Sequence, residues 1–304
     1  MFKTAHNMMK LKVKITPQTP VLVASGKTFD VTHPDIEFIR LNTKEGETIY
    51  IPGSSIKGVL RAGMEAVLGE NEKFADKICI TSEKMCPKIH EEKYKDKKVP
   101  YKSHCPVCRM FGSGDLASRL EISDIFPFDL EAPQEEKKER INTINQMISS
   151  RTGIQIDRKT GKTKGGALFS YEILGGGELF GEFTFTNYEL YQPGLLFTLF
   201  DLSNEGFLRY GHSKSRGLGV LNFTLQSIKI LQLGQLKGKS IKGIGIIEKY
   251  SDYDFYMKEK DKIDKEFNDY YENQFLYSTL TFSNKEIIDE VTGLLKSKIS
   301  TFLE

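Results

Sequence analysis

Residues 51–61 read Ile-Pro-Gly-Ser-Ser-Ile-Lys-Gly-Val-Leu-Arg and join an extended run, residues 47–50, to a helix. Ser54 or Ser55 is expected to cap this helix, because a serine oxygen accepts one of the free N–H groups at a helix start. Apolar side chains recur at helical spacing and predict a buried face made of Ile56, Val59, Leu60, Met64, Val67 and Leu68.

The start of this helix also has the features of a phosphate site. Lys57 and Arg61 are four residues apart, so they share one side of the first turns. The free N–H groups and the positive end of the helix dipole favour an anion at the same place. The sequence therefore predicts that a phosphate binds here.

The overall charge does not indicate a nucleic-acid-binding protein, because 43 basic residues face 41 acidic residues in a chain of 304. The charge is unevenly placed, however. Residues 84–102 hold seven lysines and three acids, and residues 151–164 hold five cations and one acid, Asp157. Such local patches can guide a polyanion, although solvated loops have the same composition.

No run of apolar residues approaches the roughly 18 that span a bilayer. The first residues lack the apolar core of a secretion signal. We therefore expect a cytoplasmic protein with no membrane partner. In such a chain, cysteines indicate metal binding before disulfides.

The cysteines form two pairs separated by an 18-residue gap, and they are Cys79, Cys86, Cys105 and Cys108. Two separated pairs are the usual layout of a tetrahedral structural zinc site. Because the first pair is loosely spaced, His90 or His104 could replace one cysteine. A disulfide or free core thiols are the alternatives. A catalytic zinc is not expected, because four thiolates leave no position for water.

Hydrophobic patterns place strands within residues 11–23, 38–41, 119–125, 181–186 and 219–225. The apolar run at residues 195–202 is too short to assign from its pattern, and a repeat of the earlier strand–helix unit favours a helix there. Strand–helix–strand then occurs twice, which suggests an α+β, ferredoxin-like core with long insertions. We divide the chain into a core, residues 1–235, and a C-terminal helical extension, residues 236–304. An insertion at residues 71–112 carries the cysteines, and residues 131–140 are expected to be flexible.

A glycine-rich loop, residues 211–219, precedes the last core strand. Its three glycines let backbone N–H groups approach an anion, and Lys214 and Arg216 add positive charge. The spacing fits neither the P-loop nor the dinucleotide motif. Together with residues 54–61, the loop is a second candidate for phosphate contact. His212 could be a general base, but contact with phosphate or solvent is more usual for such a histidine.

An early loop carries Asp30 and Asp35 with His33 between them. Loop carboxylates are usually solvated. Next to an RNA backbone, however, a carboxylate can hold a divalent cation or assist the 2′-hydroxyl as a nucleophile.

Four segments together resemble the RAMP superfamily of CRISPR-associated proteins: residues 51–61, 105–112, 118–124 and 211–219. The resemblance covers residues 11 to about 230. It is closest to the backbone subunits of type III effector complexes, the Csm/Cmr-like group, which act in antiviral defence.

The resemblance implies an RRM-like fold that binds CRISPR RNA without sequence preference and stacks head to tail with copies of itself. Target RNA and other type III subunits are implied as partners. Residues 140–169 match the projecting hairpin, called the thumb, that wedges between guide and target. The implied RNA contacts are Ser54, Ser55, Lys57, Arg61, Arg151, Lys164, His212, Lys214, Ser215 and Arg216.

The resemblance also implies that Asp35 is catalytic, because residues 35–40 match the family's pattern of an aspartate before an extended segment with arginine. Cleavage of target RNA would then use Mg²⁺ or another divalent metal. Residues 21–26 lack the histidine that the family often has there, so Asp30 could replace Asp35, or the subunit could bind RNA without cutting it. Two further alternatives are an RNA-processing endonuclease that uses histidine without metal and a zinc-stapled interaction module.

Overall fold

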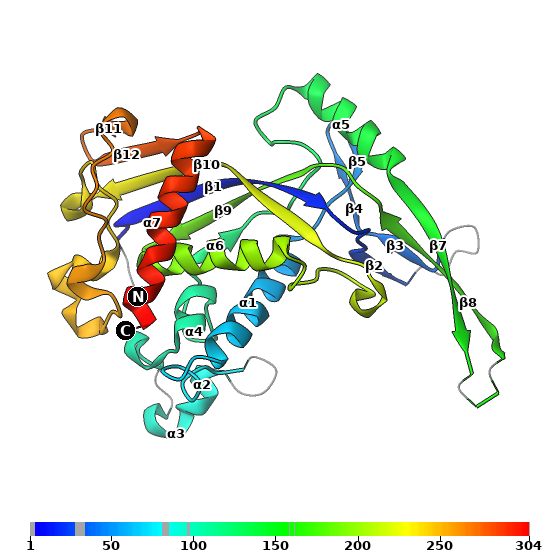
Figure 1. Ribbon diagram of the computed structural model, residues 1–304, viewed down its shortest axis with the longest axis horizontal. Coiled ribbons are helices and arrows are strands. Elements are labelled where there is room, and N and C mark those ends of the chain that lie inside the picture. Colours follow the sequence, from blue (N-terminus) through cyan, green and yellow to red (C-terminus); the bar gives the residue numbers. More distant parts are fainter. Residues whose placement is uncertain are drawn as a thin grey trace.

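The computed structural model describes residues 4–27, 34–80, 85–95, 98–157, 159–160 and 162–303. An antiparallel sheet in the order β11-β12-β10-β1-β9-β6 runs through the molecule (Figure 1). Its strands are β1 (Asn7–Pro17), β6 (Leu120–Ile122), β9 (Leu179–Thr186), β10 (Leu221–Leu233), β11 (Tyr271–Asn273) and β12 (Tyr277–Phe282). The protein is therefore a mixed α and β structure built on an antiparallel sheet, and the α+β class is the one that the sequence predicts.

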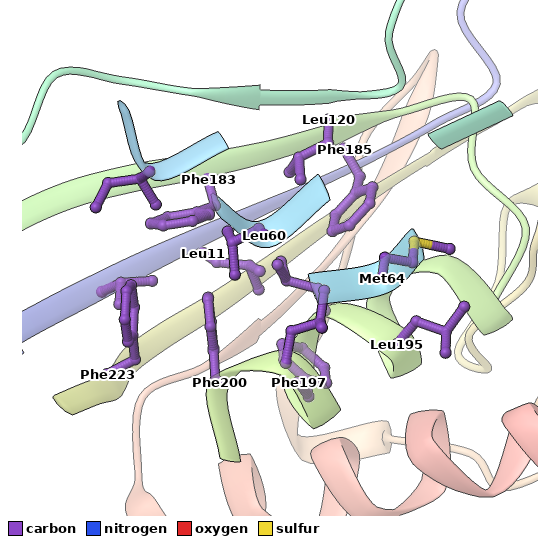
Figure 2. Close-up of a cluster of buried hydrophobic side chains, with 14 of the residues drawn as sticks. Leu11, Leu60, Met64, Leu120, Phe183, Phe185, Leu195, Phe197, Phe200 and Phe223 are labelled. Atoms are coloured by element: carbon purple, nitrogen blue, oxygen red, sulfur yellow. The ribbon is translucent and has the colours of Figure 1, made fainter. Parts of the chain in front are cut away.

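Two helices cover one face of this sheet, α1 (Gly53–Gly69) and α6 (Tyr191–Asn204), and α7 (Lys285–Leu303) packs against α6. Strand β1 alternates, so every second side chain from Met9 to Ile15 enters the core. Figure 2 shows side chains that meet there: Leu11, Leu60, Met64, Leu120, Phe183, Phe185, Leu195, Phe197, Phe200 and Phe223. The buried face predicted for α1 is confirmed for Ile56, Leu60, Met64 and Leu68. It is wrong for Val67, which is 40% exposed, and Val59 is partly buried.

A second sheet has the order β2-β3-β8-β7. It consists of β2 (Ala24–Lys27), β3 (Ile36–Phe38), β7 (Ile148–Ile156) and β8 (Thr163–Leu174). Strands β7 and β8 form a hairpin that projects from the body of the molecule (Figure 1). This hairpin lies within residues 140–169, to which the sequence assigns the thumb, and continues beyond them to Leu174.

Shorter elements complete the chain. Strands β4 (Arg40–Thr43) and β5 (Gly46–Ile49) form a separate ribbon, beside which lies α5 (Gln134–Gln146). The cysteine-bearing insertion contains α2 (Cys86–Ile89), α3 (Glu91–Tyr94) and α4 (Pro106–Phe111), and α4 packs against α1. Short 3₁₀ helices are Tyr101–Ser103, Lys214–Arg216, Gly234–Leu236, Ile244–Ile246, Glu248–Tyr253, Lys258–Lys260 and Asn268–Tyr270.

Two local predictions are wrong. Residues 134–140 are helical rather than flexible, because Glu135 and Glu136 suit the positive end of α5, and Ile141 and Ile144 bury its other end. The tail is not purely helical, since β11 and β12 extend the main sheet before α7 begins. The helix predicted at residues 195–202 is confirmed as part of α6.

None of the helices in the described part of the chain is both long enough and apolar enough to cross a bilayer.

Candidate nucleic-acid interface and metal site

The start of α1 is held by its neighbours rather than by a serine cap. Pro52 is the N-cap residue, and Ser54 and Ser55 lie inside the helix without capping it, so the predicted cap is wrong. The Gly53 N–H donates instead to Asp124 Oδ1 at 2.9 Å. A carboxylate therefore already occupies part of the predicted anion site.

The two cations of α1 point toward the segment that follows the cysteines. Lys57 Nζ donates to Ser118 Oγ at 2.8 Å, and burial, followed by the charge of Arg61, lowers the pKa of Lys57. The Arg61 guanidinium donates to the Gly112 carbonyl at 2.8 Å and to Glu65 at 3.0 Å. Phosphate contact by these two residues stays a prediction, and it would require them to leave these partners.

The glycine-rich loop, residues 211–219, is fastened to the chain that follows β1. The His212 N–H donates to the Leu22 carbonyl at 2.7 Å, and the Gly219 N–H donates to the Pro20 carbonyl at 2.9 Å. A Cβ atom at Gly211 would lie 2.2 Å from the Leu22 oxygen, so the loop requires glycine there. The exposed side chains of this loop are His212, Lys214, Ser215 and Arg216.

The loop also contacts the middle of the hairpin. The Arg216 guanidinium lies 5.5 Å from the centre of the Phe169 ring in β8, which is a cation–π distance. A Cβ atom at Gly153, opposite Phe169 in β7, would lie 2.3 Å from that ring, so the glycine leaves room for it. The hairpin and the loop are therefore packed together at this point.

Asp35 is exposed and lies beside the next residue of β8. Its Oδ2 accepts a hydrogen bond from the Ser170 N–H at 2.6 Å, and the Asp35 N–H donates to Ser170 Oγ at 3.3 Å. Residues 169 and 170 thus connect Asp35 to the loop that carries Arg216. Asp30 and His33, the alternatives in the same loop, lie outside the described residues.

Glu172 fixes the strand that follows Asp35. Its two carboxylate oxygens accept from the Phe38 N–H and from the Arg40 guanidinium, each at 2.8 Å. The Glu172 side chain is only 13% exposed, so water competes little for these bonds. The arginine of the 35–40 segment therefore has a structural partner within the protein.

The hairpin carries two predicted RNA contacts. Arg151 is exposed on β7, opposite Tyr171. Lys164 belongs to β8, but its side chain lies outside the described residues. Neither residue is tested by the structure, and both stay predictions.

No pattern in the sequence predicts that Phe169, Ser170 or Glu172 belongs to the site. Their role depends on the parallel pairing of β3 with β8, in which Ile36 lies opposite Tyr171. Partners that are about 135 residues apart in the chain leave no local pattern that could predict this pairing.

The four cysteines come together as predicted. Their Sγ atoms all lie within 4.8 Å of one another, and all four residues are buried. Both ring nitrogens of His104 are hydrogen-bonded outside the cysteine cluster. Nδ1 lies 3.0 Å from the Pro100 carbonyl oxygen, and Nε2 lies 3.0 Å from Ser113 Oγ. Within the described residues, this is the one group of three or more potential ligands, and it contains neither histidine.

The chemistry of this group fits a structural metal such as zinc. Hydrogen bonding within the cluster lowers the pKa of the Cys105 thiol and raises the pKa of the Cys86 and Cys108 thiols. The four thiols therefore titrate together as one group, and the fit to a metal rests on their number and separation. Four thiolates at such separations are the ligand set of closed zinc sites.

A family model of the RAMP superfamily matches residues 14–222. The chain belongs to the RAMP superfamily. This RAMP protein is also similar to a chain in a structure described as "Cryo-EM structure of the Type III-B Cmr-beta bound to cognate target RNA". That similarity has 13% identity and a TM-score of 0.42, and it covers 71% of this chain and 96% of the other. No curated protein matches the chain, so the family assignment rests on the sequence match.

Proposed function

We propose that this RAMP protein is a CRISPR RNA-binding backbone subunit of a type III interference complex. The observation that carries the proposal is the junction at residues 169–170 of β8. There the hairpin contacts both Asp35 and the loop with Arg216. A guide RNA on that loop would run past a carboxylate and a projecting hairpin, which are the parts a target-cleaving subunit needs.

The connections of the central sheet agree with this proposal. Strands β1, β6, β9 and β10 with helices α1 and α6 follow the order β-α-β-β-α-β, and the sheet order is β10-β1-β9-β6. We identify this arrangement as ferredoxin-like, the fold that the family resemblance implies.

The RNA would be held through its phosphates. Lys214 and Arg216 are exposed on the glycine-rich loop, and Arg151 is exposed on the hairpin. Contacts of this kind give affinity without reading bases. Copies of the subunit would then follow one another along the guide, since a head-to-tail interface that does not close makes a filament.

Cleavage of the target would use Asp35. One carboxylate oxygen of Asp35 accepts from the Ser170 N–H, and in this proposal the other would take the proton of a 2′-hydroxyl. That hydroxyl attacks the adjacent phosphorus in line, the new O2′–P bond forms, and the P–O5′ bond breaks. The 5′-oxygen leaves with a proton from water, and the other product ends in a 2′,3′-cyclic phosphate.

A divalent metal such as Mg²⁺ would stabilise the charge on the phosphate. Within the described residues, no group of three potential ligands includes Asp35. Phosphate oxygens of the RNA and water would be suitable further ligands for such a metal. The cysteines would hold a separate structural zinc ion that fixes the insertion to α1.

A structural RNA-binding subunit without cleavage is the second candidate. It is favoured by the use of Arg40 within the protein, where its guanidinium donates to Glu172.

The substitution Asp35→Asn separates the two candidates. The asparagine side chain keeps an oxygen for the Ser170 N–H but cannot take a proton, so we expect target cleavage by the assembled complex to fall at least ~10²-fold. Binding of guide and target, measured by gel shift with labelled RNA, should not change. Glu45→Gln, in the turn between β4 and β5, is the control. If Asp35→Asn cleaves at the wild-type rate, Asp35 is not catalytic and the structural candidate is favoured.

A further inference from the structure

Arg61 is largely buried and bonded within the protein, whereas a side chain that binds RNA is expected to be exposed to solvent. Its side chain is 13% exposed and pairs with Glu65, which is 11% exposed. The Nη1 atom donates to the Gly112 carbonyl at 2.8 Å, and the Nη2 atom lies 3.3 Å from Cys108 Sγ. Each of its three nitrogens therefore has an acceptor on this protein, and one acceptor is a thiol of the cysteine cluster.

The donors around the cluster explain why an arginine is placed there. Four thiolates on a divalent ion leave a net charge of about −2 in a buried site. Two backbone N–H groups approach the sulfurs, from Cys105 to Cys86 at 3.3 Å and from Cys108 to Cys105 at 3.5 Å. Arg61 adds a permanent positive charge, and a charge-assisted hydrogen bond to a thiolate is stronger than a neutral one.

The partners of Arg61 also tie the cluster to α1. Cys108 and Gly112 are the beginning and the end of one short stretch that contains most of α4, and the Gly112 N–H donates to the Cys108 carbonyl at 3.0 Å. The planar guanidinium spans both ends of this stretch. A lysine would provide the charge but not two donors in a fixed plane.

We propose that Arg61 supports the metal site from outside its four thiols, by neutralising Cys108 and fixing α4 to α1, and that it does not contact the guide RNA. The inference rests on the proposed structural metal and goes beyond the proposed RNA function. It replaces the phosphate role that the sequence assigns to Arg61. Glu65 has an orienting role, and its carboxylate would also oppose an incoming phosphate.

The test measures metal affinity rather than activity. Arg61→Gln and Arg61→Lys are purified under reducing conditions and titrated with Co²⁺, whose thiolate absorption reports coordination, and with Zn²⁺ against a chromogenic chelator. We expect both variants to bind metal about 10- to 100-fold more weakly than the wild type. Arg140→Gln is the matched control, because Arg140 also pairs with a glutamate four residues away on a helix, at 2.9 Å from Glu136, but does so on α5.

The outcomes are distinguishable. Wild-type metal affinity in folded Arg61→Lys would overturn the inference, as would a loss of single-stranded RNA binding with metal affinity unchanged. If Arg61→Gln does not fold, Arg61→Lys, which keeps the charge, decides the question alone. If the wild-type protein shows no four-thiolate spectrum with Co²⁺ and no Zn²⁺ binding, the metal proposal fails, and this inference fails with it. RNA binding by the wild-type protein tests the proposed function separately.

Discussion

Gly53 fixes the position of α1 because it has no side chain. A Cβ atom there would lie 2.1 Å from the Ile122 carbonyl oxygen and 2.7 Å from that of Ser123. The backbone of α1 therefore approaches the end of β6 at a distance that only glycine permits. In the motif of residues 51–61, Gly53 is therefore required by packing. Gly58 of the same helix is not, because a Cβ atom placed on it would have no atom within 4 Å.

Alanine substitutions at these two glycines should change the free energy of unfolding in opposite directions. Gly53→Ala should lower the free energy of unfolding by about 1–3 kcal/mol, because α1 must move away from β6. Gly58→Ala should raise it by roughly 0.5–1 kcal/mol, because an exposed helix interior favours alanine. Urea denaturation of both variants beside the wild type measures these changes. Equal effects of the two substitutions would contradict the close approach of α1 to β6.

The sequence predicted the right types of residue at the site but not always their partners. Lys57 and Arg61 do lie on one side of α1, as their spacing of four requires. Their direction could not be predicted, because it depends on Ser118 and Gly112, which are supplied by a distant segment. The cysteine spacing, in contrast, was sufficient to predict that the four thiols converge, because few other arrangements satisfy two such pairs.

At the scale of elements, β3 is a short strand whose position depends on side chains. Within the described residues, its register with β8 has one aligned pair, Ile36 with Tyr171. Ser170 and Glu172 of β8 hold it at either end, through Asp35 and Phe38. On its other side β3 pairs with β2 at Ile36 and Phe38. Since a strand of three residues has few such pairs, we infer that Glu172 contributes much to how firmly Asp35 is placed.

Glu172→Gln should therefore loosen β3. Glutamine offers one accepting oxygen in place of two, so either the Phe38 N–H or Arg40 loses its partner, at a cost of about 1–2 kcal/mol. Hydrogen–deuterium exchange at residues 36–38 should become roughly tenfold faster. Glu178→Gln removes exposed ion pairs with Lys14 and Arg140 and should leave this exchange unchanged. Unchanged exchange in Glu172→Gln would show that β3 is held by other contacts.

Elements with a clear hydrophobic period were predicted well, and those set by tertiary contact were not. Strands β1 and β9 alternate, so their type could be recognised. The apolar run in α6 was too short for this, and its type was predicted from the repeat of the strand–helix unit. Helix α5 is highly charged and is anchored by Ile141 and Ile144. Its amphipathic signal was too weak to distinguish it from a loop.

At the scale of the whole molecule, the tail is joined to the core by buried acidic groups. Asp261 accepts from the Leu190 N–H and the Gly245 N–H, both at 2.7 Å, and Glu189 accepts from the Met257 N–H at 3.0 Å. The end of α7 adds a stack of Phe302 on Tyr191, with ring centres 4.2 Å apart. The division at residue 235 stays a prediction, but these contacts and β12 make the tail part of the same packed body.

The titration of Glu189 should make the stability of the protein depend on pH. Burial raises its pKa to about 7, whereas the unfolded chain has an ordinary value near 4.5. The folded state therefore binds the proton more tightly, and stability is lost as the pH rises through this interval. Relative to Glu189→Gln, which does not titrate, the wild-type free energy of unfolding should fall by on the order of 3 kcal/mol between pH 4.5 and pH 7.5.

Urea denaturation at several pH values measures this difference. The exposed Glu205, changed to glutamine, should follow the wild type at every pH. Parallel stability curves for the wild type and Glu189→Gln would show that Glu189 does not titrate in this interval.

The central claim is that this RAMP protein holds a guide RNA on the loop of residues 211–219. Its most direct test is purification from the native host, followed by sequencing of any RNA that co-elutes. We predict short RNAs with one fixed 5′ sequence, and their loss from a Lys214→Ala/Arg216→Ala variant but not from a Lys239→Ala/Lys249→Ala variant, whose changes lie in the tail. Protein free of RNA, or RNA of random sequence and length that both variants retain equally, would contradict the account.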